Sequence, residues 1–128
     1  MPIERRLDAS TDVLWTTIRG SITIHDLRQH LDAVSEMGGH KYCEIIDVRE
    51  AEPLFGARDL PSLAAHGHAL FGRRDMAPRA VVVNPADLFS FGISRLFSTL
   101  ASPWVTFRVF DNLEAAVDFI HATSASRS

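Results

Sequence analysis

The chain contains a single cysteine, no long apolar run and no large excess of charge of either sign. Because Cys43 has no second cysteine to pair with, an internal disulfide framework is excluded, and the strand-like run around Cys43 indicates a small packed thiol. Residues 1–6 alternate between apolar and charged side chains and lack the apolar stretch of a signal peptide or a membrane span. We therefore expect a cytoplasmic protein that is not inserted into a membrane.

The charge balance argues against nucleic acid as a partner. The 13 lysine and arginine residues stand against 16 aspartate and glutamate residues, and the formal net charge is −3. Such a chain has no overall attraction for a phosphate backbone. A Walker loop and a glycine-rich dinucleotide turn are also missing, because Gly38-Gly39 follows a helical pattern and not a strand. We therefore expect no nucleic acid partner and no cofactor.

At 128 residues, the chain is long enough for one domain with a sizeable core. Two short strand patterns, at 3–8 and 13–18, flank a polar loop and predict a hairpin. Three later runs, at 42–48, 80–83 and 104–110, are rich in β-branched or aromatic residues and predict buried strands.

Helical patterns separate these later strands, and each begins with a recognisable signal. Thr23, followed by Asp26 three residues later, resembles a capping box before the first helix. Asp59 is expected to cap the second helix, and Asp111 with Glu114 the fourth. The third helix follows an asparagine-proline turn.

The elements run in the order β-β-α-β-α-β-α-β-α, which predicts an α/β domain over residues 1–121 and a frayed tail over 122–128. The strand–helix–strand unit from 79 to 110 demands a parallel sheet with covered faces. The expected architecture is a single mixed sheet, in which an N-terminal antiparallel hairpin leads into parallel strands joined by crossover helices.

Polar residues follow the predicted parallel strands, at the edge where ligands collect in open α/β sheets. Asp47 and Arg49 end one strand, and Asn84 ends the next. One interpretation is a polar rim around an apolar cleft, in which these three residues contact a ligand. In the other, Asp47 and Arg49 form a local ion pair and Asn84 is a turn residue. Asp111 is explained by its capping role alone.

The third predicted helix carries apolar side chains on two faces. The stripe expected in the core comprises Phe89, Ile93, Leu96, Phe97 and Leu100. Leu88, Phe91 and Arg95 lie on a different side of the helix. This second face is either covered by the loop from 51 to 58 or contacts a ligand, a partner protein or a second subunit.

We expect no bound metal and no catalytic residue. His66 and His68 are two positions apart, and a helix points such side chains in different directions. Ser90, Ser94 and Ser98 lie along one flank of the third helix, without the strand-to-helix elbow of a nucleophilic serine.

Five segments, taken in order, resemble the SpoIIAA-like family. They cover residues 18–23, 45–47, 79–83, 91–97 and 109–116. The family consists of bacterial proteins of the STAS fold, related to anti-sigma-factor antagonists and similar to CRAL-TRIO domains. The resemblance implies a STAS-like fold and a non-enzymatic binding or regulatory domain that requires no metal or cofactor.

The resemblance does not extend to the phosphorylation switch. The antagonists carry a phosphorylatable serine in an Asp-Ser-Ser-Gly-Leu turn before the second helix, whereas the corresponding region here reads Asp59-Leu60-Pro61-Ser62-Leu63. The decisive positions do not match, so neither a kinase nor an anti-sigma partner is implied.

Three functional hypotheses follow. The leading one is a module whose second face on the third helix, Leu88, Phe91 and Arg95, binds a small apolar or amphipathic ligand or a protein partner. The second is a small enzyme that uses the polar residues at the strand ends. The third is a structural homodimer without ligand, packed through the same helical face.

Overall fold

The chain folds around one five-stranded sheet, whose strands lie side by side in the order of the sequence. The computed structural model describes residues 2–127. Its strands are β1 (Ile3–Asp8), β2 (Val13–Ile22), β3 (Cys43–Pro53), β4 (Arg79–Val82) and β5 (Phe107–Phe110). Its helices are α1 (Ile24–Glu36), α2 (Leu60–Phe71), α3 (Leu88–Ala101) and α4 (Leu113–Arg127), with the short 3₁₀ turns η1 (Gly39–Lys41) and η2 (Ala57–Asp59).

The topology is that of a hairpin followed by crossover units. β1 pairs with β2 in antiparallel fashion, and β2 to β5 pair in parallel. A helix lies in every parallel connection, as parallel pairing requires. The predicted α/β architecture, a single mixed sheet with the order β-β-α-β-α-β-α-β-α, is confirmed.

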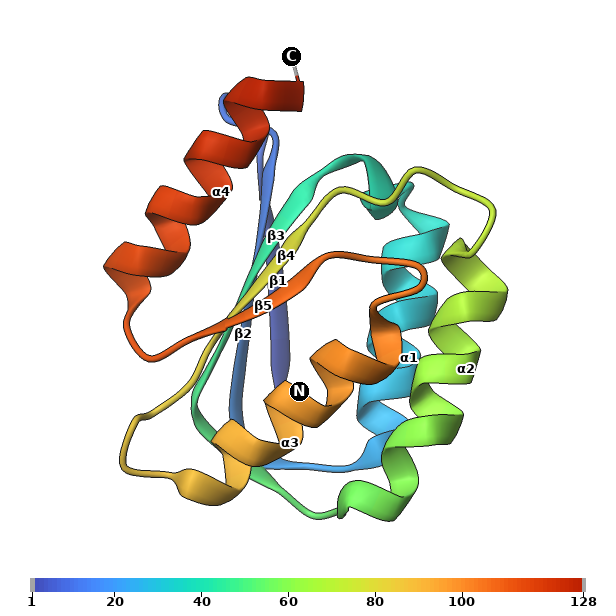
Figure 1. Cartoon of the computed structure of the whole chain (residues 1–128), viewed down its shortest axis with the longest axis vertical. Helices are drawn as coiled ribbons and strands as arrows, with labels where there is room; N and C mark the ends of the chain where they lie inside the picture. Colours follow the sequence, from blue (N-terminus) through green and yellow to red (C-terminus); the bar gives the residue numbers. More distant parts are fainter. Residues whose placement is uncertain (1, 128) are drawn as a thin grey trace.

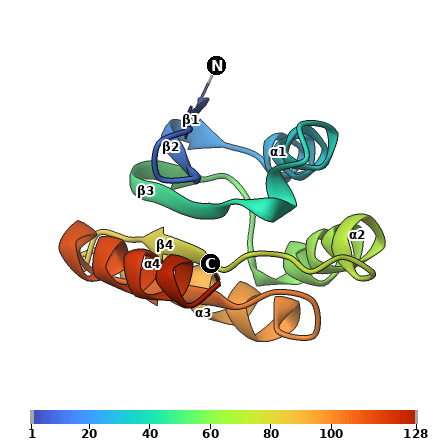
Figure 2. The ribbon, with the colours of Figure 1, turned by 90° about the horizontal axis from the view of Figure 1, so that it is seen from above.

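Helices cover both faces of the sheet: α1, α2 and α3 lie on one face and α4 on the other (Figure 1). Seen from above, α1 and α2 run side by side on the three-helix face (Figure 2). Successive strand residues point to opposite faces. Ile45 and Val82 therefore cluster with Ile120 of α4, whereas Ile46 and Val81 cluster on the face of α1 to α3.

Both β2 and β3 extend beyond the ends that the sequence predicted, at Ile18 and Val48. The parallel ladder continues to the pair Ile22–Pro53, after a register shift beside Ile18. Gly20 lies inside this extension with a φ of 72°, a conformation that glycine adopts without strain. Because a glycine usually marks the end of a strand pattern, the predicted strand ended at Ile18, before Gly20, whereas β2 continues to Ile22.

Trp104 is not part of the last strand, which begins at Phe107. The backbone N–H of Trp104 donates to the Ala101 carbonyl at 3.0 Å, in the turn that ends α3. The indole ring stacks on Phe71 with 6.0 Å between ring centroids, and it meets Phe97 edge to face. The ring therefore packs between α2 and α3, and this contact overrides the strand preference of the residues around it.

The predicted cap of α1 is present in the structure, whereas the start of α2 is stabilised differently from the prediction. Thr23 and Asp26 form the expected capping box of α1, with hydrogen bonds of 3.1 and 2.9 Å to each other's backbone N–H groups. Asp59 occupies the N-cap position of α2 as expected, but its side chain forms no capping hydrogen bond to that helix. Its carboxylate accepts a hydrogen bond from the Gly56 N–H at 3.0 Å and so stabilises η2, the turn before the helix.

The start of α4 also departs from the prediction. Asn112 Oδ1 accepts a hydrogen bond from the Ala115 N–H at 2.8 Å, whereas Asp111 accepts one from the Asn112 side chain. Asp111 therefore orients the residue that caps the helix. At its other end, α4 continues to Arg127, so residues 122–127 of the expected frayed tail are helical, and Ser128 lies outside the described residues.

The packing of α3 corrects the predicted core stripe. Ser90, Phe97 and Ala101 are buried, while Phe89 is 54% exposed and Leu96 38% exposed. At 100° per residue, the three buried positions lie on one side of the helix. The prediction considered only large apolar side chains, but small residues let this helix approach the sheet closely.

Candidate functional site

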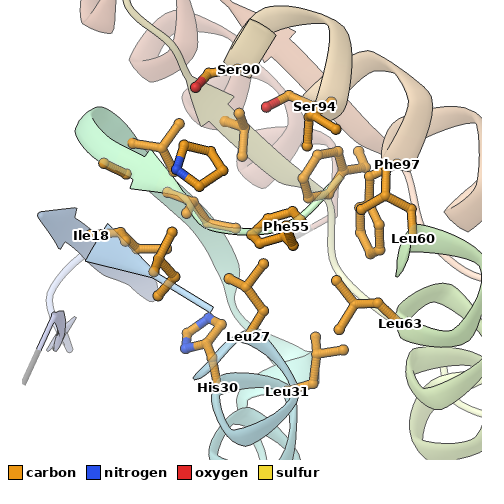
Figure 3. Close-up of a pocket in the computed structure, with 18 residues that line it drawn as sticks. Ile18, Leu27, His30, Leu31, Phe55, Leu60, Leu63, Ser90, Ser94 and Phe97 are labelled. Atoms are coloured by element: carbon orange, nitrogen blue, oxygen red, sulfur yellow. The ribbon is translucent and has the colours of Figure 1, made fainter. Parts of the chain in front are cut away.

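An apolar cavity of about 120 Å³ lies between the sheet and the three helices on its more covered face (Figure 3). Ile18, Ile46 and Val81 form its sheet wall, one from each of β2, β3 and β4. Leu27 of α1, Leu63 of α2 and Phe97 of α3 are representative of its helical wall, and Phe55 from the β3–α2 connection completes it. Three strands and three helices thus each contribute an apolar side chain to one cavity.

The cavity lies toward the carboxyl ends of the parallel strands. Ala51 and Pro53, near the end of β3, line it together with Leu60 at the start of α2 and Ser90 in the first turn of α3. This is the edge where open α/β sheets bind ligands. The cavity lies at the edge of the sheet where the sequence predicted a site, but Asp47, Arg49 and Asn84 are not among the residues that line it.

Glu44 is the centre of a buried polar network beside this cavity. Its side chain, on β3, is 2% exposed. Glu44 Oε2 accepts hydrogen bonds from the Thr16 hydroxyl at 2.5 Å and from His30 Nε2 at 2.8 Å, and Arg79 Nε lies 3.3 Å from Glu44 Oε1. The network therefore joins β2, β3 and β4 to α1.

The Arg79 guanidinium, also 2% exposed, extends the network to the amino-terminal end of the sheet. Nη2 donates to the Gly39 carbonyl at 2.8 Å, and Nη1 donates to the carbonyls of Ala77, at 3.0 Å, and Tyr42. One buried cation thus fixes η1 and the segments that lead into β3 and β4. This many partners is what a buried charge requires.

His30 lines the cavity and has partners on both ring nitrogens. Arg5 Nη1 donates to Nδ1 at 3.0 Å, and because a guanidinium can only donate, Nδ1 is the acceptor. Nε2 therefore carries the hydrogen that is donated to Glu44. Both ring nitrogens of His30 are therefore engaged within the chain, which fixes the orientation of the ring.

Burial alone would raise the pKa of Glu44, but its neighbours reverse that effect. His30 contributes the largest opposing effect, followed by the Arg79 charge and the Thr16 hydroxyl, and the pKa of Glu44 falls to about 2. Glu44 is therefore ionised at any physiological pH. Its negative charge compensates the Arg79 cation within the chain.

The structure places Asp47 and Arg49 against each other. Arg49 Nε and Nη2 donate to the two carboxylate oxygens of Asp47 at 2.9 and 2.8 Å. These hydrogen bonds lower the pKa of Asp47, and the carboxylate raises the pKa of Arg49. Strand alternation puts Asp47 on the face of α4, opposite to Glu44 and Ile46 and to the cavity. The pair matches the local ion pair that the sequence allowed.

Asn84 has a local role in the β4–α3 connection. Its Oδ1 accepts a hydrogen bond from the Ala86 N–H at 3.0 Å, which closes a turn two residues long. The side chain is exposed and is not among those that line the cavity. The enzyme hypothesis required Asp47, Arg49 and Asn84 to share a cavity, and none of them lines this one.

The second face of α3 divides into two environments. Phe91 is half-buried and packs against the sheet cluster that contains Ile18 and Val81. The Arg95 guanidinium lies 5.7 Å from the Phe91 ring centre, a cation–π arrangement. Leu88 is 79% exposed at the start of the helix. Phe91 and Arg95 are thus brought together, while Leu88 points to solvent.

His30, Glu44 and Arg79 were not predicted from the sequence as a group. A signal was present: Glu44 is a carboxylate inside a run of buried strand residues, and such a charge needs partners. No pattern in the sequence identified those partners, because they lie on three other elements. Ser90 and Ser94 were noticed only as candidate nucleophiles.

Among the described residues, no three His, Cys, Asp or Glu side chains gather in a way that would hold a metal ion. Within residues 2–127, no helix combines the length and the apolar character needed to cross a membrane.

This chain is similar to a known protein in its three-dimensional structure but matches none by sequence. No model of a protein family matches the sequence, and no curated protein is similar to it in sequence. Its fold matches an uncharacterised protein of the DUF3478 family from Shewanella loihica, whose crystal structure is described as having a SpoIIAA-like fold. The TM-score is 0.60 at 21% identity, over 92% of this chain and 93% of that chain. The chain therefore has a SpoIIAA-like, STAS-like α/β fold, as the sequence resemblance implied.

Proposed function

We propose that this chain is a non-enzymatic binding or regulatory module whose ligand is a small apolar or amphipathic molecule. The observation that supports this proposal is the cavity of about 120 Å³ between the sheet and α1 to α3. Protein interiors rarely leave voids larger than a water molecule. A cavity with almost entirely apolar walls holds water poorly, and one of about 150 Å³ binds benzene. A six-membered ring or a short alkyl chain therefore matches this space, with a small movement of the walls.

The position of the cavity also favours a ligand. It adjoins the connections that follow β3 and β4, which are the least regular parts of the three-helix face. Phe55, in the first of these connections, is half-buried and lies in the middle of the lining side chains in the close-up view (Figure 3). A movement of this side chain would admit a ligand without breaking the sheet.

The proposal is tested by filling the cavity. Ala51 lines it, and Ala51→Leu adds three carbon atoms where a ligand would lie. The matched control is Ala69→Leu, which adds the same atoms at an exposed position of α2. Benzene or toluene is titrated into each protein and followed by NMR chemical shifts and by thermal unfolding. At ten times its dissociation constant, a ligand stabilises the wild type by about 1.4 kcal/mol, which is about 5 °C in Tm for a domain of this size.

We expect the wild type and Ala69→Leu to respond equally and Ala51→Leu to lose the response while remaining folded. If neither probe affects the wild type, or if Ala51→Leu binds as tightly as the control, the cavity is not a ligand site.

A second candidate function is contact with a protein through the outer face of α3. Leu88 is 79% exposed, Phe89 54% and Leu96 38%, and Arg95 adjoins them on the same side of the helix. Exposed aromatic, aliphatic and arginine side chains in one row are characteristic of interfaces. The occupant is either a second copy of the chain or another protein.

Sedimentation at several protein concentrations distinguishes these cases. We expect the wild type to associate at higher concentration and Phe89→Asp to remain monomeric, with Ala69→Asp on α2 as a charge-matched control. A wild type that stays monomeric at every concentration would exclude the homodimer.

A further inference from the structure

Three polar side chains line the cavity among the described residues: His30 of α1, and Ser90 and Ser94 of α3. His30 lies on the opposite side of the cavity from the two serines, whose hydroxyl groups are on the cavity side of α3 (Figure 3). Their hydrogen bonding decides what chemistry the cavity offers to a ligand. A group already paired within the chain has less to offer than an unpaired one.

The first two groups are already engaged. His30 Nδ1 accepts from Arg5 at 3.0 Å, and His30 Nε2 donates to Glu44 at 2.8 Å. The Ser90 hydroxyl donates to Asp87 Oδ2 at 2.7 Å, as part of the cap that begins α3. Neither side chain has a hydrogen left to donate to a ligand.

Ser94 differs from the other hydroxyl residues near it. The Ser98 hydroxyl donates to the Phe107 carbonyl, and the Thr99 hydroxyl donates to the Arg95 carbonyl one turn earlier at 3.3 Å. Within the part of the chain that the structure describes, the Ser94 hydroxyl forms no hydrogen bond, although the side chain is half-buried in the cavity wall. It therefore presents both a donor and an acceptor to the cavity.

Among residues 2–127, none of the side chains that line the cavity is a carboxylate, a lysine or an arginine that would compensate a charged ligand. Its lining residues are apolar apart from the three named above, and the adjacent Glu44 is already paired with Arg79 and His30. Transfer of an unpaired charge into such surroundings is strongly unfavourable. A carboxylate or an ammonium group inside the cavity is thus excluded.

We propose that the cavity selects an uncharged molecule of about six carbon atoms that carries one hydroxyl or carbonyl group, and that Ser94 is the residue that recognises this group. The inference rests on the proposed binding function and adds the chemical class of the ligand. An apolar body fills the space between the sheet and Phe97, while its single polar atom hydrogen-bonds to the Ser94 hydroxyl.

The test compares three aromatic probes: benzene, phenol and benzoate. Each is titrated by NMR into the wild type, Ser94→Ala and the control Ser102→Ala, which removes a hydroxyl from the exposed end of the same helix. We expect the wild type to bind phenol about fivefold more tightly than benzene, the factor that one net hydrogen bond supplies. Benzoate should bind at least tenfold more weakly than phenol, on the order expected for an uncompensated charge.

In Ser94→Ala, benzene should bind as in the wild type and phenol no more tightly than benzene, while Ser102→Ala retains the wild-type order. An intermolecular NOE between phenol and the Ser94 Hβ protons would show, without a variant, that the ligand lies beside Ser94. Equal binding of phenol and benzene by the wild type, or a phenol preference that survives in Ser94→Ala, would overturn the role of Ser94 and leave the cavity as a ligand site. Tight benzoate binding would overturn the exclusion of charge. Failure of every probe to bind would refute the proposed function itself.

Discussion

The buried carboxylate Glu44 should make the stability of this protein depend on pH in a way that one substitution removes. The pKa of Glu44 is lowered from 4.5 to about 2 in the folded chain. A carboxyl group with a depressed folded pKa contributes stability that is present above its unfolded pKa and is lost as the pH falls toward the folded value. The loss should therefore occur between about pH 5 and pH 2.

The size of the effect follows from the shift. A change of about 2.5 pKa units corresponds to about 3 kcal/mol, of which about 2 kcal/mol is lost by pH 3. Glu44→Gln keeps the shape of the side chain but does not titrate. At pH 7 this variant should be less stable by about 3–5 kcal/mol, because the buried Arg79 cation loses its compensating charge.

The assay is urea unfolding of the wild type and the variant at pH 7, 5, 4 and 3. Other carboxylates titrate in both proteins, so the informative quantity is the difference in unfolding free energy between them. We expect this difference to shrink by about 2 kcal/mol from pH 7 to pH 3. A control, Glu36→Gln at an exposed position of α1, should follow the wild type at every pH. Parallel curves for wild type and Glu44→Gln would refute the role assigned to Glu44.

Two further predictions compare neighbouring positions. Gly67→Ala would place a Cβ 2.4 Å from the Trp104 ring, so it should destabilise the fold by about 1–3 kcal/mol and change the tryptophan fluorescence. The Cβ of Gly92→Ala would meet nothing within 4 Å, so this variant should be more stable in thermal unfolding by up to about 1 kcal/mol. Asn112→Ala should lower the free energy of unfolding in urea by about 1 kcal/mol and Asp111→Ala by less, because Asn112 forms the hydrogen bond to the first turn of α4. An equal loss in both variants would favour the cap predicted at Asp111.

The order of the elements could be predicted because each depends on local patterns. The β-branched run at 80–83 and the amphipathic spacing after Thr23 are visible without knowledge of the fold. The errors occurred where a distant contact decided the outcome. Trp104 leaves the strand because Phe71 and Phe97 offer it an aromatic site, and the run after Gly20 continues as a strand because it pairs with the end of β3.

The candidate site was harder to predict for a physical reason. A cavity is the space that side chains leave unfilled, so it depends on how α1, α2 and α3 dock on the sheet and not on any one segment. The apolar pattern of α3 pointed to Phe89 and Leu96 as core residues, yet both are exposed, and the helix turns Ser90 and Ser94 toward the sheet instead. The two serines were therefore visible in the sequence, but the direction they face was not.

His30 connects the stability of the fold with the chemistry of the cavity. Its ring forms part of the cavity wall, while its two nitrogens are occupied by Arg5 and Glu44. Because both nitrogens are satisfied, this side of the cavity behaves as an apolar surface despite the histidine. The polar recognition of a ligand then falls to Ser94, on the opposite wall. If Glu44 were replaced by an apolar residue, the Nε2 hydrogen of His30 would lack its acceptor, and a ligand oxygen would gain a second possible donor. The network that stabilises the sheet thereby also sets where in the cavity a polar ligand atom should bind.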